Sequence, residues 1–560
     1  MVLVLGTTAR ADVVPTVQFG LTELSGSEAD TPVRVPVYLS CPTEQAVTVN
    51  YVVGGSATPN SDFVLSNGQV TFDPGNSIIE IAIDVNDDLI LESGLPETVV
   101  ITLSNPVNAL LGTKSSFTIR ILDNDDPTWP GDIPTPSSVS AVDTVGANLG
   151  GNTSGITCQP ATESTPQYLW IVKNNPPVLY RLAKPGATWE PSSGWPTAGV
   201  TMRYVPGSTV YPGSPDSEGV TKAEWGEASV YVCAERNGSS SSRLSVLRYD
   251  TSGVTGATTT INAAQEWVLN HVAGNADSVD EVPSSNGGFE GITWAPDSFL
   301  VSSGFRTDGS ELYNPNAPQY AGHGSGLFFI AMEDFAKVYV YALKAGGTFV
   351  RVAKLNVSSL QKTVSIEFDR DTGTLWVACD SDGGACLSRH AVFRINRNPH
   401  SPDYGRFVQR RLYNKPLNLP NSNIEGFAIA PETDCADGVK EVFWVDDSGS
   451  PGTTLFRGTI PCGCAALDSD DDGANDCEDE CPDDSLKTAG GNCGCHQFDW
   501  LITGDIESSG DLDGSDVQSL INAILSVSTD PADLCAADFN GNGMIDIGDV
   551  DGVICRLLGG

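Results

Sequence analysis

Acidic residues recur at calcium-ligand spacing near the C-terminal end of this 560-residue chain. Within residues 538–549, oxygen-bearing side chains occupy loop positions 1, 3, 5, 9 and 12, and a glycine occupies position 6. A twelve-residue Ca²⁺ loop needs this pattern, because the glycine allows a sharp turn, position 7 offers its carbonyl and the last acid closes the coordination shell. The predicted ligands are Asp538, Asn540, Asn542, Met544 (through its carbonyl) and Asp549.

Two further segments repeat this plan. Residues 505–516 have Gly510 at position 6 and Asp513 at position 9, and their predicted ligands are Asp505, Glu507, Ser509, Asp511 and Asp516. Residues 468–479 place acids at positions 1, 3, 5, 9 and 12, namely Asp468, Asp470, Asp472, Asp476 and Asp479. The sequence therefore predicts three Ca²⁺ loops. For the two later loops, the alternative is that the acids only decorate turns.

Both later loops lead into apolar helical stretches, which begin at Val517 and Val550. A pair of loop–helix units without entering helices, with Asp at position 12, resembles the dockerin type I module. The resemblance implies Ca²⁺ binding and docking into a cohesin on a scaffold or cell surface. Neither Ser515-Asp516 nor Gly548-Asp549 matches a recognition pair of that family, so an intramolecular C-terminal cap is the alternative.

The acid spacing of residues 468–479, followed by Cys481-Pro482 and flanked by Cys-Gly-Cys turns, is similar to a thrombospondin type 3 repeat. With so little apolar content this segment cannot bury a core, so Ca²⁺ and disulfides must hold it. We expect a stiff, calcium-dependent spacer over residues 462–496, ahead of a dockerin-like module over residues 497–560.

The first part of the chain alternates apolar and polar residues with period two, as in Val33, Val35, Val37 and Leu39. Short strands separated by Gly, Pro, Asn and Asp turns predict an antiparallel β-sandwich over residues 12–126. Segments such as 54–58, 71–75, 103–106 and 121–126 resemble a Calx-beta domain, in which Ca²⁺ collects among loop carboxylates at one end. On matching positions the ligands are Asp62, Asp87, Asp88, Glu92, Asp123, Asp125 and Asp126, with Glu23 as a further candidate.

Residues 127–155 lack periodicity and are rich in Pro, Gly, Ser and Thr, which predicts a linker. Residues 156–461 then hold a weak repeat: a short segment with a glutamate, a turn, and an aromatic-rich strand such as 230–232, 299–301, 375–377 or 443–445. Repeats about 60 to 75 residues apart favour a β-propeller of five or six blades. The repeated glutamates are Glu218, Glu290, Glu367 and Glu425.

This Glu-containing pattern resembles the phytase-like and esterase-like propellers, which implies glutamates around one central opening. A ring of carboxylates can hold Ca²⁺ ions that bind a phosphate and activate water, with Lys222, Arg236 and Arg306 as candidate cations. The alternative is that the glutamates accept hydrogen bonds that lock neighbouring blades. The central region is thus either a partner-binding module for adhesion or display, or a calcium-dependent phosphoesterase.

Charge and cysteine content set the context. A formal charge of −41 disfavours a nucleic-acid partner. Fourteen cysteines, placed among acids rather than in zinc-ligand frames, favour disulfides and an oxidising compartment. Residues 1–11 end in an Ala9-Arg10-Ala11 cleavage pattern, expected as the remnant of a signal peptide, and no later stretch is apolar enough to predict a membrane span. We therefore expect a secreted, mostly β, multidomain protein, extracellular or on a cell surface, with Ca²⁺ as its cofactor.

Overall fold

The computed structural model describes residues 14–28, 31–86, 96–122, 129–130, 140–141, 149–162, 165–186, 188–238, 242–379, 388–397, 403–420, 422–448, 454–463, 479–481, 495, 506, 514–528, 531–538, 544–547 and 549–550. The chain divides into two compact units, residues 1–124 with 468–560, and residues 125–467. Each unit is described by itself.

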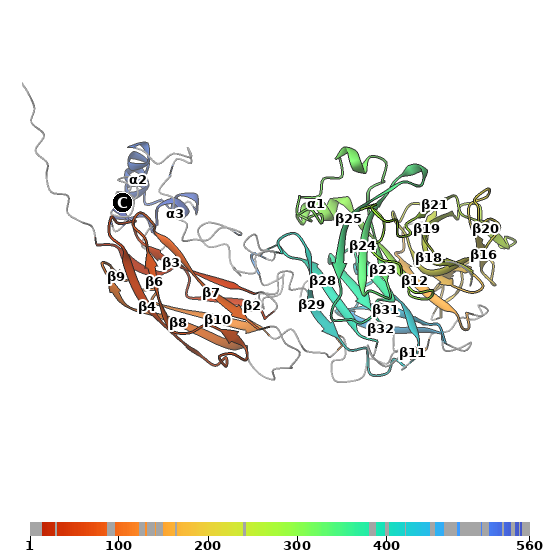
Figure 1. Cartoon of the computed structure of the whole chain (residues 1–560), viewed down its shortest axis with the longest axis horizontal. Coiled ribbons are helices and arrows are strands. Elements are labelled where there is room, and N and C mark those ends of the chain that lie inside the picture. The colour runs from red at the N-terminus through yellow and green to blue at the C-terminus, as the bar shows by residue number, and fades with distance from the viewer. Residues whose placement is uncertain are drawn as a thin grey trace, which may run out of the picture. The chain divides into compact units, whose positions relative to one another are not determined.

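The first unit contains a β-sandwich (Figure 1). One sheet has the order β5-β7-β3-β1-β9 and the other the order β2-β10-β8-β4-β6. The strands are β1 (Thr16–Phe19), β2 (Glu23–Ser27), β3 (Val33–Leu39), β4 (Val47–Gly55), β5 (Phe63–Val64), β6 (Gly68–Phe72), β7 (Ile78–Val85), β8 (Glu97–Val107), β9 (Leu110–Leu111) and β10 (Ser116–Leu122).

Alternation in the sequence explains how these two sheets share a core. Side chains of successive strand residues point to opposite faces, so the valines of β3 and the isoleucines of β7 reach the interior from one sheet. Alternate residues of β4, β8 and β10 reach it from the other sheet. The rings of Phe19 and Phe117 meet across the sandwich at 5.5 Å between centroids. The predicted β-sandwich is confirmed, but it is not wholly antiparallel, because β1 pairs with β9 and β10 with β2 in parallel.

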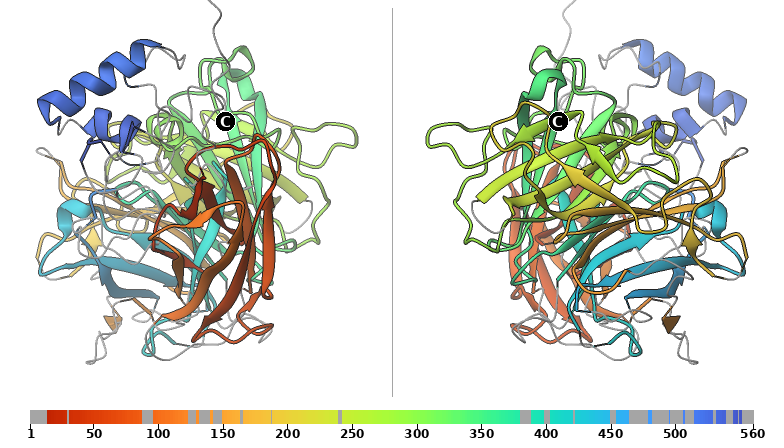
Figure 2. Two further views of the ribbon diagram at one scale, coloured as in Figure 1. Left: turned by 90° about the vertical axis from the view of Figure 1, so that its left-hand side faces the viewer. Right: turned by 90° about the vertical axis from the view of Figure 1, so that its right-hand side faces the viewer.

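The C-terminal part of the first unit is helical. It contains α2 (Gly514–Ser526) and α3 (Pro531–Ala537), drawn in blue in Figure 2. Leu520 and Ala523 of α2 pack with Leu534 and Ala537 of α3 and with Ile545. The helix expected after the acidic loop at 505–516 is thus present as α2. The helix α3, which ends just before Asp538, was not predicted.

The described residues of the second unit form five separate sheets, with orders β12-β13-β14-β16-β20 (β15 beside β14), β17-β18-β19-β21, β22-β23-β24-β25, β26-β27-β28-β29 and β11-β32-β31-β30. All neighbouring strands in them are antiparallel except β16 and β20, which are parallel. The strands are β11 (Ser140–Ala141), β12 (Thr153–Gln159), β13 (Tyr168–Lys173), β14 (Val178–Ala183), β15 (Glu190–Pro191), β16 (Val200–Arg203), β17 (Pro215–Thr221), β18 (Ser229–Asn237), β19 (Ser242–Asp250), β20 (Thr260–Asn262), β21 (Gln265–Val268), β22 (Phe289–Pro296), β23 (Gly326–Met332), β24 (Lys337–Leu343), β25 (Phe349–Asn356), β26 (Ser365–Asp369), β27 (Thr374–Ala378), β28 (His390–Ile395), β29 (Phe407–Tyr413), β30 (Ile424–Ile429), β31 (Val439–Asp446) and β32 (Leu455–Pro461). Short helices η1 (Pro318–Tyr320), η2 (Ala345–Gly347) and η3 (Glu432–Asp434) lie between strands.

One edge strand of each sheet contacts its counterparts in two other sheets. These strands, termed the inner strands below, are β12, β17, β22, β26 and β30. Their contacts follow the cyclic order β12–β17–β22–β26–β30–β12. Four of them contain the predicted Glu-bearing segments, and the fifth, β12, was not predicted as a member of the repeat.

Part of the segment expected to be a linker belongs to the packed second unit. In β11, Ser140 and Ala141 pair with Arg457 and Phe456 of β32. Trp129 is 3% exposed and donates its indole N–H to the carbonyl of Thr459 at 3.0 Å. Residues close to both ends of this unit therefore share one sheet and one core cluster.

One predicted strand is wrong. Residues 299–301 lie in α1 (Asp297–Ser302), and the aromatic strand that pairs with β22 is β23, which begins at Gly326. Pro296 stands at the N-cap of α1, where its lack of an N–H costs nothing. The expected strand therefore begins only after the intervening residues 303–325. Among the described residues, no helix is long and apolar enough to cross a membrane.

Candidate functional site

Four of the five inner strands have a β-bulge, where one residue is left out of the regular pairing with the next strand. In β22 the pairing with β23 skips Glu290, and in β30 the pairing with β31 skips Glu425. The pairing of β17 with β18 is similarly shifted around Glu218, and that of β12 with β13 skips Ser154. A β-bulge leaves the extra residue unpaired and re-aims its side chain. The repeated position is therefore Glu, Glu, Glu and Ser in four of the five inner strands.

A glycine follows each of these bulge residues and lets the inner strands approach closely. A Cβ added at Gly219 would lie 2.7 Å from the backbone nitrogen of Ile292, and one added at Gly426 would lie 2.7 Å from the carbonyl oxygen of Ser154. No side chain fits at such distances. The glycine of each pair is thus a steric requirement of the contacts between inner strands.

A cavity of about 400 Å³ opens beside the starts of the inner strands, and we call it the acidic cavity. Its wall is polar and, among the described residues, contains no aromatic side chain. The residues that line it are Asn152, Asn174, Asn175, Asp216, Arg236, Gly238, Asn286, Glu290, Glu333, Lys362, Val364, Asn423, Glu425 and Asp447.

Two cations compensate part of the negative charge of the cavity. Arg236 ion-pairs with Asp216 at 2.5 Å and with Glu235 at 2.7 Å. Lys362 ion-pairs with Glu333 at 2.6 Å. Of the three cations predicted from the sequence, only Arg236 lines the cavity. Lys222 is buried and donates to the carbonyls of residues 227 and 229, and Arg306 donates to the carbonyl of Ser310. Lys362 was not predicted.

Carboxylates in the cavity wall and just behind it influence one another. Burial, and then the charges of Glu425, Asp216 and Glu235, raise the pKa of Glu218 well above its ordinary value. Burial, followed by the charges of Glu218, Glu235 and Glu425, does the same to the pKa of Glu290. Burial raises the pKa of Glu235 to about 7, although Arg236 opposes the shift. The cavity thus concentrates more negative charge than its described cations neutralise.

Glu367 does not join this group. It lies in β26, where the pairing with β27 has no bulge, and no glycine follows it. Thr157 donates its hydroxyl to Oε1 of Glu367 at 3.4 Å, and the pKa of Glu367 is raised by burial with Arg370 opposing. Val364, just before β26, contributes to the cavity wall instead. The structure therefore brings together Glu218, Glu290 and Glu425, and leaves out the fourth predicted glutamate.

Two residues that no sequence motif marked, Asn423 and Asp447, complete the wall beside Glu425. Asn423 donates its amide nitrogen to Glu425 at 2.7 Å and to Oδ2 of Asp447 at 3.2 Å. Ser154 donates to the other carboxylate oxygen of Glu425 at 2.9 Å. Asp447 follows β31 and pairs through its backbone with Asn423 and Asn152. No local motif marks Asp447, because only strand pairing brings it beside β30.

At the sandwich, one predicted calcium ligand can be placed. Asp62 precedes β5, and its carbonyl accepts the backbone N–H of Asn86, the last described residue after β7. Its carboxylate also accepts the N–H of Thr58. β7 ends beside β5, close to Asp62, and β10 ends opposite the start of β8. This placement fits a terminal Ca²⁺ cluster.

In the C-terminal module, three predicted ligands are buried acids. Asp516 and Asp549 are fully buried, and Asp538 is 2% exposed. Asp516, at position 12 of its loop, accepts the N–H of Ile506 at position 2, and Asp549 accepts that of Asp546. Charged groups this deeply buried need hydrogen-bond donors or a cation, so these side chains fit Ca²⁺. Met544 is exposed, in keeping with a carbonyl ligand.

The other predicted ligands lie outside the described residues. They are Asp87, Asp88, Glu92, Asp123, Asp125, Asp126, Asp468, Asp470, Asp472, Asp476, Asp505, Glu507, Ser509, Asp511, Asn540 and Asn542. Asp479 is described and accepts the N–H of Cys481. Glu23, a further candidate, ion-pairs with Arg120 at 3.3 Å.

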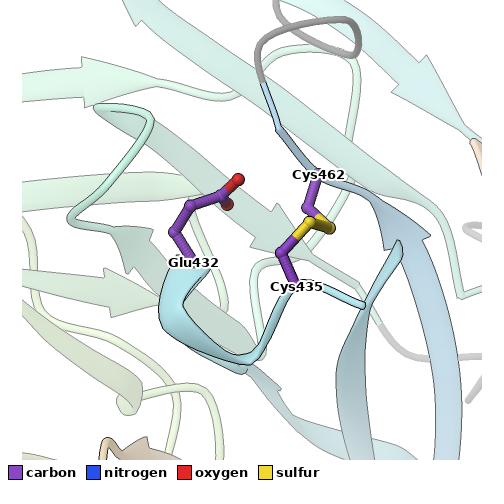
Figure 3. Close-up of side chains that lie close together, drawn as sticks. All are labelled: Glu432, Cys435 and Cys462. Carbon is purple, nitrogen blue, oxygen red and sulfur yellow. A yellow bond between two sulfur atoms is a disulfide. The ribbon is translucent and has the colours of Figure 1, made fainter. Parts of the chain in front are cut away.

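Most of the described cysteines form disulfides, as expected, whereas Cys158 and Cys233 are free and buried. Cys481 bonds to Cys495. Cys435 and Cys462 form a second bond, beside Glu432 (Figure 3). These two cysteines and the glutamate lie close enough for a metal site, but disulfide sulfurs are not thiolate ligands. Glu432 instead accepts the N–H of Gly463 and ion-pairs with Lys440 at 3.2 Å.

Comparison with known families assigns the two ends of the chain. Residues 11–125 match the model of the Calx-beta domain, and residues 503–558 match that of the dockerin type I domain. Both predicted resemblances are thereby confirmed, and both are calcium-binding families, which supports Ca²⁺ as the cofactor. Neither the thrombospondin-like nor the phytase-like resemblance has such a match.

Among solved structures, the apo-form Calx CBD1 domain is 27% identical, with 20% of this chain and 100% of that chain covered and a TM-score of 0.19. A PQQ-bound aldose sugar dehydrogenase from Streptomyces coelicolor is 12% identical, with 58% and 98% covered and a TM-score of 0.29. A protein of unknown function from Bacteroides thetaiotaomicron is 11% identical, with 81% and 100% covered and a TM-score of 0.26. TM-scores this low establish no chemistry for the central region.

Proposed function

We propose that this chain is an extracellular, calcium-dependent adhesion or display protein, attached through its C-terminal module and presenting its central region to a partner. The observation that carries the proposal is the pairing of a Calx-beta domain at one end with a dockerin type I domain at the other. Disulfides in both units support an oxidising compartment.

The central region is proposed to be a five-bladed β-propeller. The cyclic contacts of the inner strands support this arrangement, since each sheet then serves as one blade. The pairing of β11 with β32 supports it as well, because a strand from the start of the unit completes the sheet formed at its end. Closure of this kind joins the first and last blades without a covalent link.

The attachment partner is proposed to be a cohesin. Ile521 and Leu525 lie four residues apart on α2, so they share a face, and they are 43% and 77% exposed. Exposed apolar side chains of this size on a small helix provide contact area for a partner. Calcium enters the proposal because the dockerin type I domain is a calcium-binding family and the buried Asp516 and Asp538 stand at predicted ligand positions beside the helices.

Binding of the whole chain to a panel of immobilised type I cohesins tests this partner. We expect binding in Ca²⁺, loss of binding in EGTA, and at least tenfold weaker binding after Leu525→Asp. Leu417→Asp is the matched control, because Leu417 is 84% exposed but lies in the second unit. Absence of binding to every cohesin in Ca²⁺ would favour the intramolecular cap.

A second candidate function is a calcium-dependent phosphoesterase in the acidic cavity. The observation that favours it is the presence of Arg236 and Lys362 among carboxylates, since phosphoryl transfer needs both metal ligands and positive charge. Hydrolysis of aryl phosphates and inositol phosphates by the whole chain in Ca²⁺ is the test. Activity that disappears in Lys362→Met, with the fold retained, would support an enzyme. No turnover in Ca²⁺ on either class would end this candidate.

A further inference from the structure

A second cavity, of about 270 Å³, lies between the second and third sheets of the second unit, and we call it the aromatic pocket. Its wall comes from the loop between β17 and β18, from β18, β19 and β21, and from β22, β23, the segment before β23 and the end of β24. It borders the ends of β17 and β22, whereas the acidic cavity lies beside their starts. The aromatic pocket is therefore separate from the acidic cavity.

Buried aromatic rings make the floor of the aromatic pocket. Tyr231 pairs with Arg248 across β18 and β19, so both side chains leave the same face of the second sheet. Trp294 pairs with Phe328 across β22 and β23 in the third sheet. The ring of Tyr231 lies 4.7 Å from that of Phe328 and 6.2 Å from that of Trp267, between centroids. All four rings line the pocket and none is more than 8% exposed, so the floor is apolar and closely packed.

The rim of the pocket is polar and contains charges of both signs. Glu224 and Glu227 lie in the loop between β17 and β18, and Arg248 lies in β19. Glu224 accepts the hydroxyl of Ser325 at 2.6 Å. Oε1 of Glu227 lies 3.9 Å from Nη1 of Arg248, which is close enough for an ion pair but too long for a hydrogen bond. The rim therefore offers a donor and an acceptor with a gap between them.

Contacts behind the wall hold the pocket in shape. His323 bonds through Nε2 to Asp297 at 3.0 Å, which fixes the segment that carries Ser325. The indole N–H of Trp267 donates to the carbonyl of Lys344 at 2.7 Å and sets the orientation of that ring. A site that is ordered before binding loses less side-chain entropy when a ligand enters.

The two signs of charge narrow the class of ligand. A positive ligand matches the aromatic rings but meets Arg248 on the rim, and a negative ligand meets Glu224 and Glu227. A hydroxyl group both donates and accepts, so one hydroxyl can accept from Arg248 and donate to Glu227 across the 3.9 Å gap. The floor requires in addition an apolar face, because C–H groups pack against the negative faces of aromatic rings. A neutral sugar in its ring form has both hydroxyls at its edge and a C–H face.

We propose that the aromatic pocket binds one pyranose ring of a neutral sugar, with the C–H face on the aromatic floor and the hydroxyls on Glu224, Glu227 and Arg248. The volume of about 270 Å³ lies just below the roughly 300 Å³ at which pockets for drug-sized ligands begin, so the pocket holds one ring and not an extended chain. This ligand class rests on the proposed adhesion role only in naming what the central region binds. The binding itself needs neither a cohesin nor the acidic cavity.

Saturation-transfer NMR and calorimetry of the whole chain in Ca²⁺ test the pocket with the methyl glycosides of glucose, galactose, mannose, xylose and N-acetylglucosamine. We expect at least one glycoside to bind, with transfer strongest to the C–H protons of one ring face. Glu227→Gln and Arg248→Met should each weaken its Kd about fivefold or more, because each removes a hydrogen bond to a charged group. Glu281→Gln is the matched control: Glu281 also accepts a tyrosine hydroxyl and ion-pairs with a cation, but it lines neither cavity, so its Kd should not change.

A glycan array probed with the labelled whole chain separates two sources of the ring. Binding to terminal residues on the array supports a glycan, and binding to the soluble glycosides alone supports a free sugar. No binding to any glycoside, or equal Kd values for the parent chain, Glu227→Gln and Arg248→Met, would overturn the site. So would binding of tetramethylammonium or benzoate in the pocket with no sugar bound.

Two controls keep these outcomes distinct. Glu227 and Arg248 have partly exposed side chains, so both variants should fold, and circular dichroism checks this. If Arg248→Met fails to fold, Glu227→Gln alone decides. Sugar binding in a chain that binds no cohesin would contradict only the attachment proposal, whereas cohesin binding without sugar binding would contradict only the aromatic pocket.

Discussion

Lys440 shows how single charges are handled inside the second unit. Its side chain is 1% exposed, and its ammonium lies 2.7 Å from Oδ2 of Asp369 and 3.2 Å from Glu432. Lys440 comes from β31 and Asp369 from β26, so the pair joins two neighbouring sheets. A buried pair contributes little net stability compared with an apolar pair, but removing one partner leaves an uncompensated charge.

We therefore expect Lys440→Met to lower the free energy of unfolding of the second unit by about 3 kcal/mol. Urea titration followed by tryptophan fluorescence measures the change. The double variant Lys440→Met with Asp369→Leu should recover much of the loss, since it removes the stranded charge. A single variant as stable as the parent chain would mean that water reaches Asp369.

His323 is a second residue whose charge depends on its contacts. Nδ1 lies 2.6 Å from the carbonyl of Tyr320, and Nε2 lies 3.0 Å from Asp297 and 3.1 Å from the hydroxyl of Tyr313. The hydrogen bond to Asp297, helped by the attraction of its charge, raises the pKa of His323 although burial opposes the shift. The imidazolium donates from both nitrogens, and it fastens residues 303–325 onto the start of α1.

The sign of the pH effect follows from the raised pKa. The contribution of His323 to stability is fully present below its unfolded pKa of about 6.5 and is lost as the pH rises through the folded pKa. In the parent chain, the urea concentration at the unfolding midpoint should therefore decrease as the pH rises through the folded pKa of His323. In His323→Gln this decrease should be smaller. Parallel midpoint curves for the two proteins across pH 5 to 9 would contradict this expectation.

At the scale of elements, the glycines that follow the bulge residues decide how closely the inner strands pack. Gly219 faces Gly291 and Ile292 of the next inner strand and the sulfur of Cys233, all within 3 Å of where a Cβ would lie. Backbone atoms cannot move aside as a flexible side chain can. The close packing of β17 against β22 therefore depends on the absence of a side chain at this position.

Gly219→Ala is accordingly expected to destabilise the second unit by about 1–3 kcal/mol, the usual cost of overpacking. Thermal unfolding measured by circular dichroism reports the shift. Gly226→Ala is the control, because nothing lies within 4 Å of its added Cβ and its stability should change by less than about 0.5 kcal/mol. Equal effects of the two substitutions would show that the strands can separate without penalty.

At the scale of the whole molecule, calcium should govern the terminal modules more than the central sheets. The described core of the C-terminal module has only a few apolar side chains, whereas the second unit contains several large clusters. Because the core is small and Asp516, Asp538 and Asp549 are buried at predicted ligand positions, we expect a bound cation to contribute to the folding of this module.

Differential scanning calorimetry in Ca²⁺ and in EGTA examines this expectation. Chelation should shift the transition of the C-terminal module strongly to lower temperature. If Ca²⁺ was present at 100 times its Kd, its removal lowers the free energy of unfolding by about 2.7 kcal/mol. Asp549→Ala should produce the same transition without EGTA. A C-terminal module that melts identically with and without Ca²⁺ would remove the calcium requirement.

Local patterns in the sequence were enough for several features. Alternation predicted the sandwich strands, because the burial of one strand face depends only on neighbouring residues of the same strand. The loop at 538–549 was legible because its ligands are supplied within twelve consecutive residues, and the buried Asp538 and Asp549 agree with it. The bulged Glu-Gly pairs at Glu218, Glu290 and Glu425 were visible for the same reason.

Other features were decided only by tertiary structure, since they depend on which distant segments lie side by side. Glu367 looked equivalent to Glu290, yet the unbroken pairing of β26 with β27 takes it out of the cavity, while Asp447 enters it through the pairing of β31 with β30. The disulfide between Cys481 and Cys495 and the strand pairing of Ser140 with Arg457 also join residues that are apart in the sequence. Carboxylate spacing along the chain thus predicted calcium-binding modules near both ends, and the matches to the Calx-beta and dockerin type I families support them. Strand pairing, which no short motif encodes, decided which acids meet in its centre.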